Sequence, residues 1–226
     1  NGAYDIEVLN ITDWANKYNN GVSVDRYELL DLVNQGKVDI SQMYTTTLGQ
    51  LDKDMFVLDM PFIFRDHDHA QRVLEGEIGR TMLNNLEHES PAKGLAFTYS
   101  GGFRIIPGNE RVERIEDLRG VRVRTSHSPI AIDTFKLLGA DVVPMEIEEL
   151  TDNLSDETVQ IGESTYPRVY ALKHNQSSKV VNHTEHSLFL TSILIGSDFW
   201  NSLTPELQSV VSEAAKVAAR YERSIS

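Results

Sequence analysis

Residues 115–145 read IEDLRGVRVRTSHSPIAIDTFKLLGADVVPM, and this stretch predicts one unit of an α/β fold. Residues 115–125 have the pattern of a short helix that leads into a strand, and residues 128–139 that of a helix followed by a second strand at 141–145. Pro129 suits the first turn of this helix because proline lacks the N–H that a helix start leaves unpaired, and Gly139 suits its end. Alternation of strands and helices predicts an α/β architecture built on mainly parallel sheets.

The same alternation runs through the rest of the chain. Apolar residues repeat at strand spacing in some segments and at helix spacing in others. Aspartate or threonine opens several of the helices, and the glycine pair Gly101–Gly102 interrupts one extended run. The predicted strands cover 4–11, 37–44, 93–108 with its glycine break, 157–165 and 177–197, and the predicted helices cover 25–36, 66–90 and 204–226.

Composition narrows the class of protein. The chain has 226 residues, of which 40% are hydrophobic, so it can form one large domain or two modest ones with real cores. Lys and Arg number 21 against 34 Asp and Glu, and the net charge of −13 argues against nucleic acid as a partner. Cysteine is absent, which excludes a disulfide framework and thiolate chemistry. No apolar run approaches the ~20 residues of a membrane span.

Three arginines, Arg119, Arg122 and Arg124, form a basic cluster against this acidic background. They alternate with valines, so one of them can share a strand face with buried residues. From this pattern alone, Arg124 is more simply explained as an exposed residue of an edge strand. Arg119 and Arg122 are predicted to be solvated.

Four segments together resemble the DctP-type substrate-binding proteins of TRAP transporters, which are periplasmic receptors for organic acid anions. They are DMPFIFRDHDHAQRVLEGEIG (59–79), GGFRIIPGNERVERIEDLRGVRVRT (101–125), LLGADVVPM (137–145) and LTPELQSVVSEAAKVAARYE (203–222). The resemblance implies a two-lobed clamp whose lobes are joined by hinge strands and a long spanning helix. Residues 1–101 with about 190–226 would form lobe I, lacking its first βα unit, and residues 102–189 would form lobe II.

The resemblance also implies a ligand-binding site. Arg124 would hold the ligand carboxylate through two parallel hydrogen bonds, because a planar guanidinium matches the two oxygens of a carboxylate. Arg104, in the GGFR turn, would be second, and Ser164 would stand where asparagine is common in the family. The further expected contacts are His127, His186, Tyr44 and Ile147, with Tyr44 from lobe I and Ile147 at a place where relatives often have an aromatic residue.

Other readings of the polar residues carry less weight. His67, His69, His183 and His186 are metal-ligand candidates, but the first two lie at an acidic helix start, where capping explains them. Serines near histidine at 128 and 164 match no nucleophile elbow. The clusters Glu146, Glu148, Glu149 and Glu110, Glu113, Glu116 are interpreted as solvated faces. No metal and no cofactor is expected.

We therefore expect a periplasmic binding protein and not an enzyme. An organic acid anion would dock on the arginines, the lobes would close, and TRAP membrane subunits would recognise the closed form. The preferred ligand is a uronate or aldonate, because the site would be rich in hydrogen-bond donors; a dicarboxylate, a sialic acid and a keto acid remain open. The receptor is expected to be a monomer, and the alternative function is the ligand-binding domain of a sensory receptor.

Overall fold

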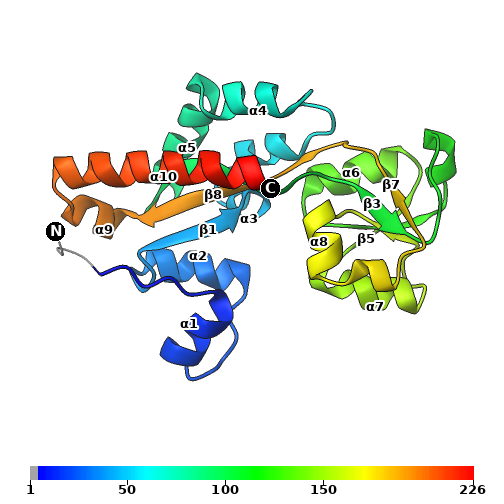
Figure 1. Ribbon diagram of the computed structural model, residues 1–226, viewed down its shortest axis with the longest axis horizontal. Coiled ribbons are helices and arrows are strands. Elements are labelled where there is room, and N and C mark those ends of the chain that lie inside the picture. The colour runs from blue at the N-terminus through cyan, green and yellow to red at the C-terminus, as the bar shows by residue number, and fades with distance from the viewer. Residues whose placement is uncertain (1–4) are drawn as a thin grey trace.

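The computed structural model describes residues 5–226, which form two lobes, each with its own sheet (Figure 1). The first lobe has a three-stranded sheet in the order β1-β8-β2, and the second has a five-stranded sheet in the order β5-β4-β6-β3-β7. Figure 1 draws these lobes side by side, with two extended segments running between them. The α/β class and the two-lobed clamp predicted from the sequence are confirmed.

The first lobe is built on β1 (Ile40–Tyr44), β8 (Leu188–Gly196) and β2 (Ala92–Phe103). Both strand pairs are antiparallel, and β8 lies in the centre. The helices of this lobe are α1 (Ile11–Tyr18), α2 (Arg26–Asn34), α3 (Thr45–Leu48), η1 (Lys53–Asp59), α4 (His67–Leu74), α5 (Glu77–Glu89), α9 (Ser197–Ser202) and α10 (Pro205–Ile225). Its core includes Leu48, Met55, Leu86 and Phe97.

The second lobe contains β3 (Ile106–Gly108), β4 (Arg122–Thr125), β5 (Asp141–Pro144), β6 (Ile161–Gly162) and β7 (Val180–Asn182). β4 pairs in parallel with β5 and β6, whereas β3 pairs antiparallel with β6 and β7. Its helices are η2 (Ile115–Leu118), α6 (Pro129–Leu137), η3 (Ile147–Glu149), α7 (Leu150–Ser155), α8 (Tyr166–Ala171) and η4 (His174–Gln176). One apolar cluster packs around Val123 and Ile161, and another around Leu150 and Leu154.

Side-chain caps fix where the predicted helices begin. Asp25 accepts hydrogen bonds at the start of α2 and forms a capping box with Glu28. Asp66 caps α4 through the His69 N–H, and Ser128 caps α6. Thr204 caps α10 and is followed by Pro205 in the first turn, as the sequence predicted.

Two segments connect the lobes. β2 leaves the first sheet and continues toward β3, and Gly101 and Gly102 have positive φ angles of 88° and 75° in this crossing. Residues 183–187 return from β7 to β8. The predicted glycine break therefore lies where the chain passes from one sheet to the next.

Two sequence predictions need correction. Residues 5–10 of the predicted strand 4–11 form no strand, Ile11 begins α1, and Tyr4 lies outside the described residues. The sheets are not mainly parallel, because β8 returns from the second lobe and inserts antiparallel between β1 and β2, an order that local alternation does not encode. Helix α10 runs along β2 toward the crossing, where the Ser226 Oγ accepts from the Gly101 N–H at 2.8 Å.

Candidate functional site

Arg124 lies near the end of β4 with its side chain buried. Its Nε and Nη2 donate to the Met145 carbonyl at 3.0 and 2.7 Å, and its Nη1 donates to the Glu163 carbonyl at 3.1 Å. A guanidinium has five N–H donors, so these contacts leave two donors without a partner among residues 5–226. Burial lowers the pKa of Arg124 to about 10, while nearby Glu163 opposes this shift, so the group remains charged at neutral pH.

Arg104, Glu163 and His186 form a second buried network. Arg104 Nε lies 3.9 Å from a Glu163 carboxylate oxygen, and the same oxygen is 2.9 Å from His186 Nε2. His186 Nδ1 lies 2.7 Å from the Thr184 hydroxyl. Burial alone would raise the pKa of Glu163, but Arg104, His186 and Arg124 together hold it at about 2, so this carboxylate is ionised.

Asp59, at the end of η1 in the first lobe, lies on the other side of Arg104. Its Oδ1 is 3.9 Å from Arg104 Nη2. Burial raises the pKa of Asp59 to about 6 even though Arg104 opposes the shift. Arg104 therefore stands between one ionised carboxylate, that of Glu163, and one that titrates close to neutrality.

Several buried polar atoms around these residues have no hydrogen-bond partner. They include Asp59 Oδ2, Glu163 Oε2, Ser164 Oγ, Thr125 Oγ1, Arg168 Nε and His174 Nε2. The Ser164 N–H donates to the Ile105 carbonyl, and the Ile105 N–H donates to the Ser164 carbonyl, so the backbone of Ser164 is held in place while its hydroxyl remains unpaired. Because buried polar groups normally have partners, a cluster of unpaired ones indicates a place that receives a polar molecule.

Two aromatic rings, those of Tyr44 in β1 and Phe189 in β8, contact Arg104 and Arg168. Phe189 stacks on Tyr44 with ring centroids 5.1 Å apart, and the Arg104 guanidinium carbon lies 4.0 Å from the Phe189 ring centroid. Arg168, from α8, approaches both rings and donates to the Tyr44 hydroxyl at 2.7 Å. Such cation–π contacts orient a guanidinium while leaving its N–H edge available.

The structure brings together five of the seven residues predicted for the site. Arg104, Arg124, Ser164, His186 and Tyr44 all belong to the cluster just described. His127 is half-exposed, with Nε2 3.7 Å from Glu146, and Ile147 is buried in the apolar cluster of Leu150 and Leu154.

Sequence reasoning did not find Asp59, Arg168 or Phe189 as members of the cluster, nor assign a role to Glu163. Asp59 belongs to the quoted segment 59–79, and Glu163 directly precedes Ser164, so the resemblance could have pointed to both. Arg168 and Phe189 give no local signal, because their neighbours come from other parts of the chain.

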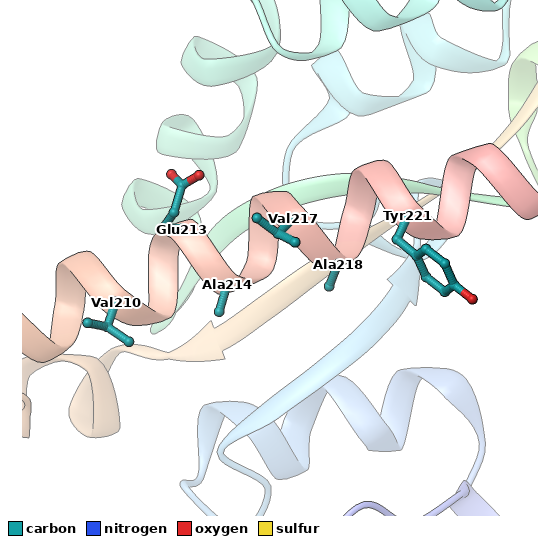
Figure 2. Close-up of a pocket in the computed structure, with 6 residues that line it drawn as sticks. All are labelled: Val210, Glu213, Ala214, Val217, Ala218 and Tyr221. Carbon is teal, nitrogen blue, oxygen red and sulfur yellow. The ribbon is translucent and has the colours of Figure 1, made fainter. Parts of the chain in front are cut away.

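A separate pocket of about 620 Å³ lies along α10 and is lined by residues of this helix (Figure 2). Its walls are almost entirely apolar, and the side chains that line it are Val210, Glu213, Ala214, Val217, Ala218 and Tyr221. A pocket with one carboxylate and no cation does not suit an anion, so it is distinct from the arginine cluster.

Residues 5–226 lack the features of two other kinds of site. No group of three or more His, Asp or Glu residues in this part of the chain could hold a metal ion. None of the helices described here is both long and apolar enough to span a membrane.

Comparison with known proteins places this chain in a family. The family model for the bacterial extracellular solute-binding proteins of family 7, DctP, matches residues 15–226. An uncharacterized protein of Haemophilus influenzae is 32% identical over 198 residues, which cover 87% of this chain and 60% of the relative. The 2,3-diketo-L-gulonate-binding periplasmic protein YiaO of Escherichia coli is 29% identical over 85% of this chain and 58% of its own length. The chain thus spans about 60% of these relatives.

Solved structures agree with this match. A TRAP periplasmic solute-binding protein from Xanthobacter autotrophicus with bound β-D-galacturonate has a TM-score of 0.80 and 30% identity, covering 95% of this chain and 75% of that one. A second, from Pseudomonas putida with bound D-glucuronate, has a TM-score of 0.81 and 30% identity, covering 88% and 65%. The chain therefore belongs to family 7 of the bacterial extracellular solute-binding proteins, the DctP family.

Proposed function

We propose that this protein captures an organic acid anion between its lobes and delivers it to a TRAP-type membrane transporter. The observation that carries the proposal is Arg124, a buried and charged guanidinium with two donors left over after its backbone contacts. Two donors on one planar group suit the two oxygens of a carboxylate. The unpaired hydroxyl of Ser164 and the other unpaired polar atoms nearby suit the hydroxyl groups of a sugar acid.

The ligand class is a hydroxylated monocarboxylate, with a uronate or an aldonate preferred. Related structures support this choice, because proteins from Xanthobacter and Pseudomonas hold uronates and one from Polaromonas, at 29% identity, holds D-erythronate. A dicarboxylate is the second class, since a relative 28% identical to this chain is named a C4-dicarboxylate-binding protein.

Arg104, His186 and Tyr44 act as supporting groups in this proposal. Arg104 contributes positive charge that Glu163 and Asp59 partly neutralise, and His186 keeps the Glu163 carboxylate in place. Tyr44 closes the site from the first lobe together with Phe189. His127, which is half-exposed, would contact only a ligand that reaches the rim, and Ile147 supports the site from the core.

The lobes move as units that meet at the two connecting segments. Lobe I comprises residues 1–101 with about 190–226, and lobe II comprises residues 102–189, apart from Phe103, Leu188 and Phe189, which belong to strands of the first sheet. The hinge lies at Gly101 and Gly102. Membership of a family of extracellular binding proteins supports a periplasmic location. We propose further that the receptor is a monomer and that it meets the TRAP membrane subunits when closed.

Thermal unfolding with a panel of acids tests the proposal. The panel contains D-glucuronate, D-galacturonate, D-erythronate, 2,3-diketo-L-gulonate and succinate, with neutral D-glucose as the control. A ligand at 100 times its Kd adds about 2.7 kcal/mol of stability, which is a measurable rise in Tm. The proposed anion site would be contradicted if glucose stabilised the protein as much as the acids do, or if no acid of the panel stabilised it.

A further inference from the structure

Arg26, the first residue of α2, connects the first lobe to the second. Its Nη2 forms an ion pair with a Glu146 carboxylate oxygen and lies 3.8 Å from Glu148 Oε2. Helix α2 packs on β1 and β8, whereas both glutamates belong to η3 and its N-cap in the second lobe. The guanidinium also lies over the Tyr44 ring, 5.0 Å from its centroid. The capping box at Asp25 holds the helix start, and with it the backbone of Arg26, in place.

Arg168 makes the reverse connection, from the second lobe to the first. It donates from Nη1 to the Tyr44 hydroxyl at 2.7 Å and to the Ser100 hydroxyl at 3.0 Å, and Nη2 lies 3.6 Å from Glu148 Oε1. Glu148 is therefore shared between an arginine of each lobe. Arg26, Glu146, Glu148, Arg168 and Tyr44 form one continuous polar contact, the interlobe clasp.

We propose that Arg26 is a positioning residue, and that its pairing with Glu146 and Glu148 sets how far the lobes close and how long a bound anion is retained. The retention part of this inference rests on the proposed function. The partners lie on different lobes, so the contacts are lost when the lobes separate and stabilise only the closed arrangement. All of them are made by the protein's own side chains, so part of the drive to close is independent of the ligand.

The clasp differs in chemistry from the anion site beneath it. Arg124 is buried and contacts backbone carbonyls, whereas Arg26 and Glu146 are each about one-third exposed and face each other's charges. A partly exposed ion pair is screened by salt, because the Debye length falls from ~10 Å at 0.1 M to ~3 Å at 1 M ionic strength. We therefore expect the closed fraction of the ligand-free protein to fall as the salt concentration rises.

The closed fraction is measured with fluorescent labels on the two lobes. The chain has no cysteine, so Asp31→Cys on α2 and Asp152→Cys on α7 give two unique sites at exposed positions. The two helices belong to different lobes (Figure 1). Energy transfer between the labels reports closure of the ligand-free protein, and its loss after dilution reports dissociation of D-glucuronate. We expect Arg26→Glu to lower the ligand-free closed fraction and to speed dissociation about tenfold.

The charge swap separates a clasp from a ligand contact. Adding Glu146→Arg to Arg26→Glu restores opposite charges across the lobes. The double variant should release D-glucuronate at least threefold more slowly than Arg26→Glu alone and should regain most of the ligand-free closed fraction. Glu146 is chosen because Glu148 also pairs with Arg168. Lys37→Glu makes an equal change of charge on an exposed residue of the first lobe, and its dissociation rate for D-glucuronate should stay within twofold of that of wild type.

The possible results divide clearly. If the swap is no better than Arg26→Glu alone, or if Arg26→Glu leaves ligand-free closure unchanged, the clasp is refuted, and a failed swap points to direct contact between Arg26 and the anion. If wild type binds no acid of the panel, the proposed function fails, while the ligand-free distance and its salt dependence still decide the clasp.

Discussion

Replacing Arg124 with lysine tests the anion site most directly. Lysine keeps the positive charge but loses the planar fork, so one ammonium cannot contact the Met145 and Glu163 carbonyls and still offer two parallel donors to a carboxylate. Truncation of a buried charge pair costs ~2–5 kcal/mol of affinity, and we expect Arg124→Lys to fall in this range. Calorimetric titration with D-glucuronate measures the loss, which corresponds to at least ~30-fold in Kd.

The same change also lowers the stability of the second lobe. A buried carbonyl that loses its donor costs ~1–3 kcal/mol, so Arg124→Lys should reduce the free energy of unfolding by that amount in urea. A cleft arginine that only bound ligand would leave stability unchanged. Because the loss is a fraction of a typical domain stability, the variant remains folded and the affinity can be measured.

Arg122→Ala is the matched control on the same strand. Arg122 is exposed and donates to the Glu157 and Thr158 carbonyls at the other end of β4. Arg122→Ala should leave affinity within ~0.5 kcal/mol of wild type. Equal losses of affinity for the two variants, or no loss for Arg124→Lys, would refute the assignment of Arg124 as the carboxylate-binding group.

Three further predictions concern stability and pH. Burial, with Arg124 and Arg168 nearby, lowers the pKa of His174 to about 4. Between pH 6.5 and 4 only the unfolded chain takes up this proton, so acid favours unfolding. In urea unfolding, the free energy of unfolding of wild type should therefore fall by ~2 kcal/mol more than that of His174→Gln between pH 7 and 5. At Gly101, which has a positive φ, the Cβ of an alanine would clash with the Thr165 side chain, so Gly101→Ala should lower the free energy of unfolding in urea by at least ~2 kcal/mol. Gly120 also has a positive φ but lies in open space, so Gly120→Ala should cost only the ~1 kcal/mol of backbone strain. Asp59 has a pKa of about 6, and a bound anion should raise this pKa further. Binding of glucuronate at pH 6–7 should therefore be accompanied by proton uptake, which calorimetry in buffers of different ionisation enthalpy detects. Asp59→Asn should abolish this proton uptake.

Local sequence signals predicted most of the elements. The caps at Asp66, Ser128 and Thr204 identify helix starts because each satisfies backbone N–H groups within its own turn. The strand predicted at 4–11 failed for the opposite reason. Alternation shows only that a segment can form a strand, and among residues 5–226 no strand pairs with residues 5–10.

The site was predictable only as far as the family resemblance reached. Arg122 and Arg124 are two residues apart and share a strand face, so alternation cannot separate them; their difference lies in position along β4 and in what surrounds each end. Glu146 and Glu148 were interpreted as a solvated face, yet they meet Arg26, 120 and 122 residues away in the chain. Contacts of this kind depend on how the lobes meet, which no local pattern records.

The contrast between the two buried arginines explains why an acidic protein directs guanidinium groups inward. Arg104 lies 3.9 Å from both Asp59 and Glu163, so carboxylates of the protein offset its charge. Arg124 donates only to carbonyl oxygens, and although the Glu163 carboxylate is near enough to favour its charged form, no carboxylate of residues 5–226 forms an ion pair with it. Carbonyl dipoles hold the guanidinium in place without cancelling its unit charge. A carboxylate brought by a ligand is then the partner that completes Arg124, and burial makes that pairing selective because a neutral molecule would leave the charge uncompensated.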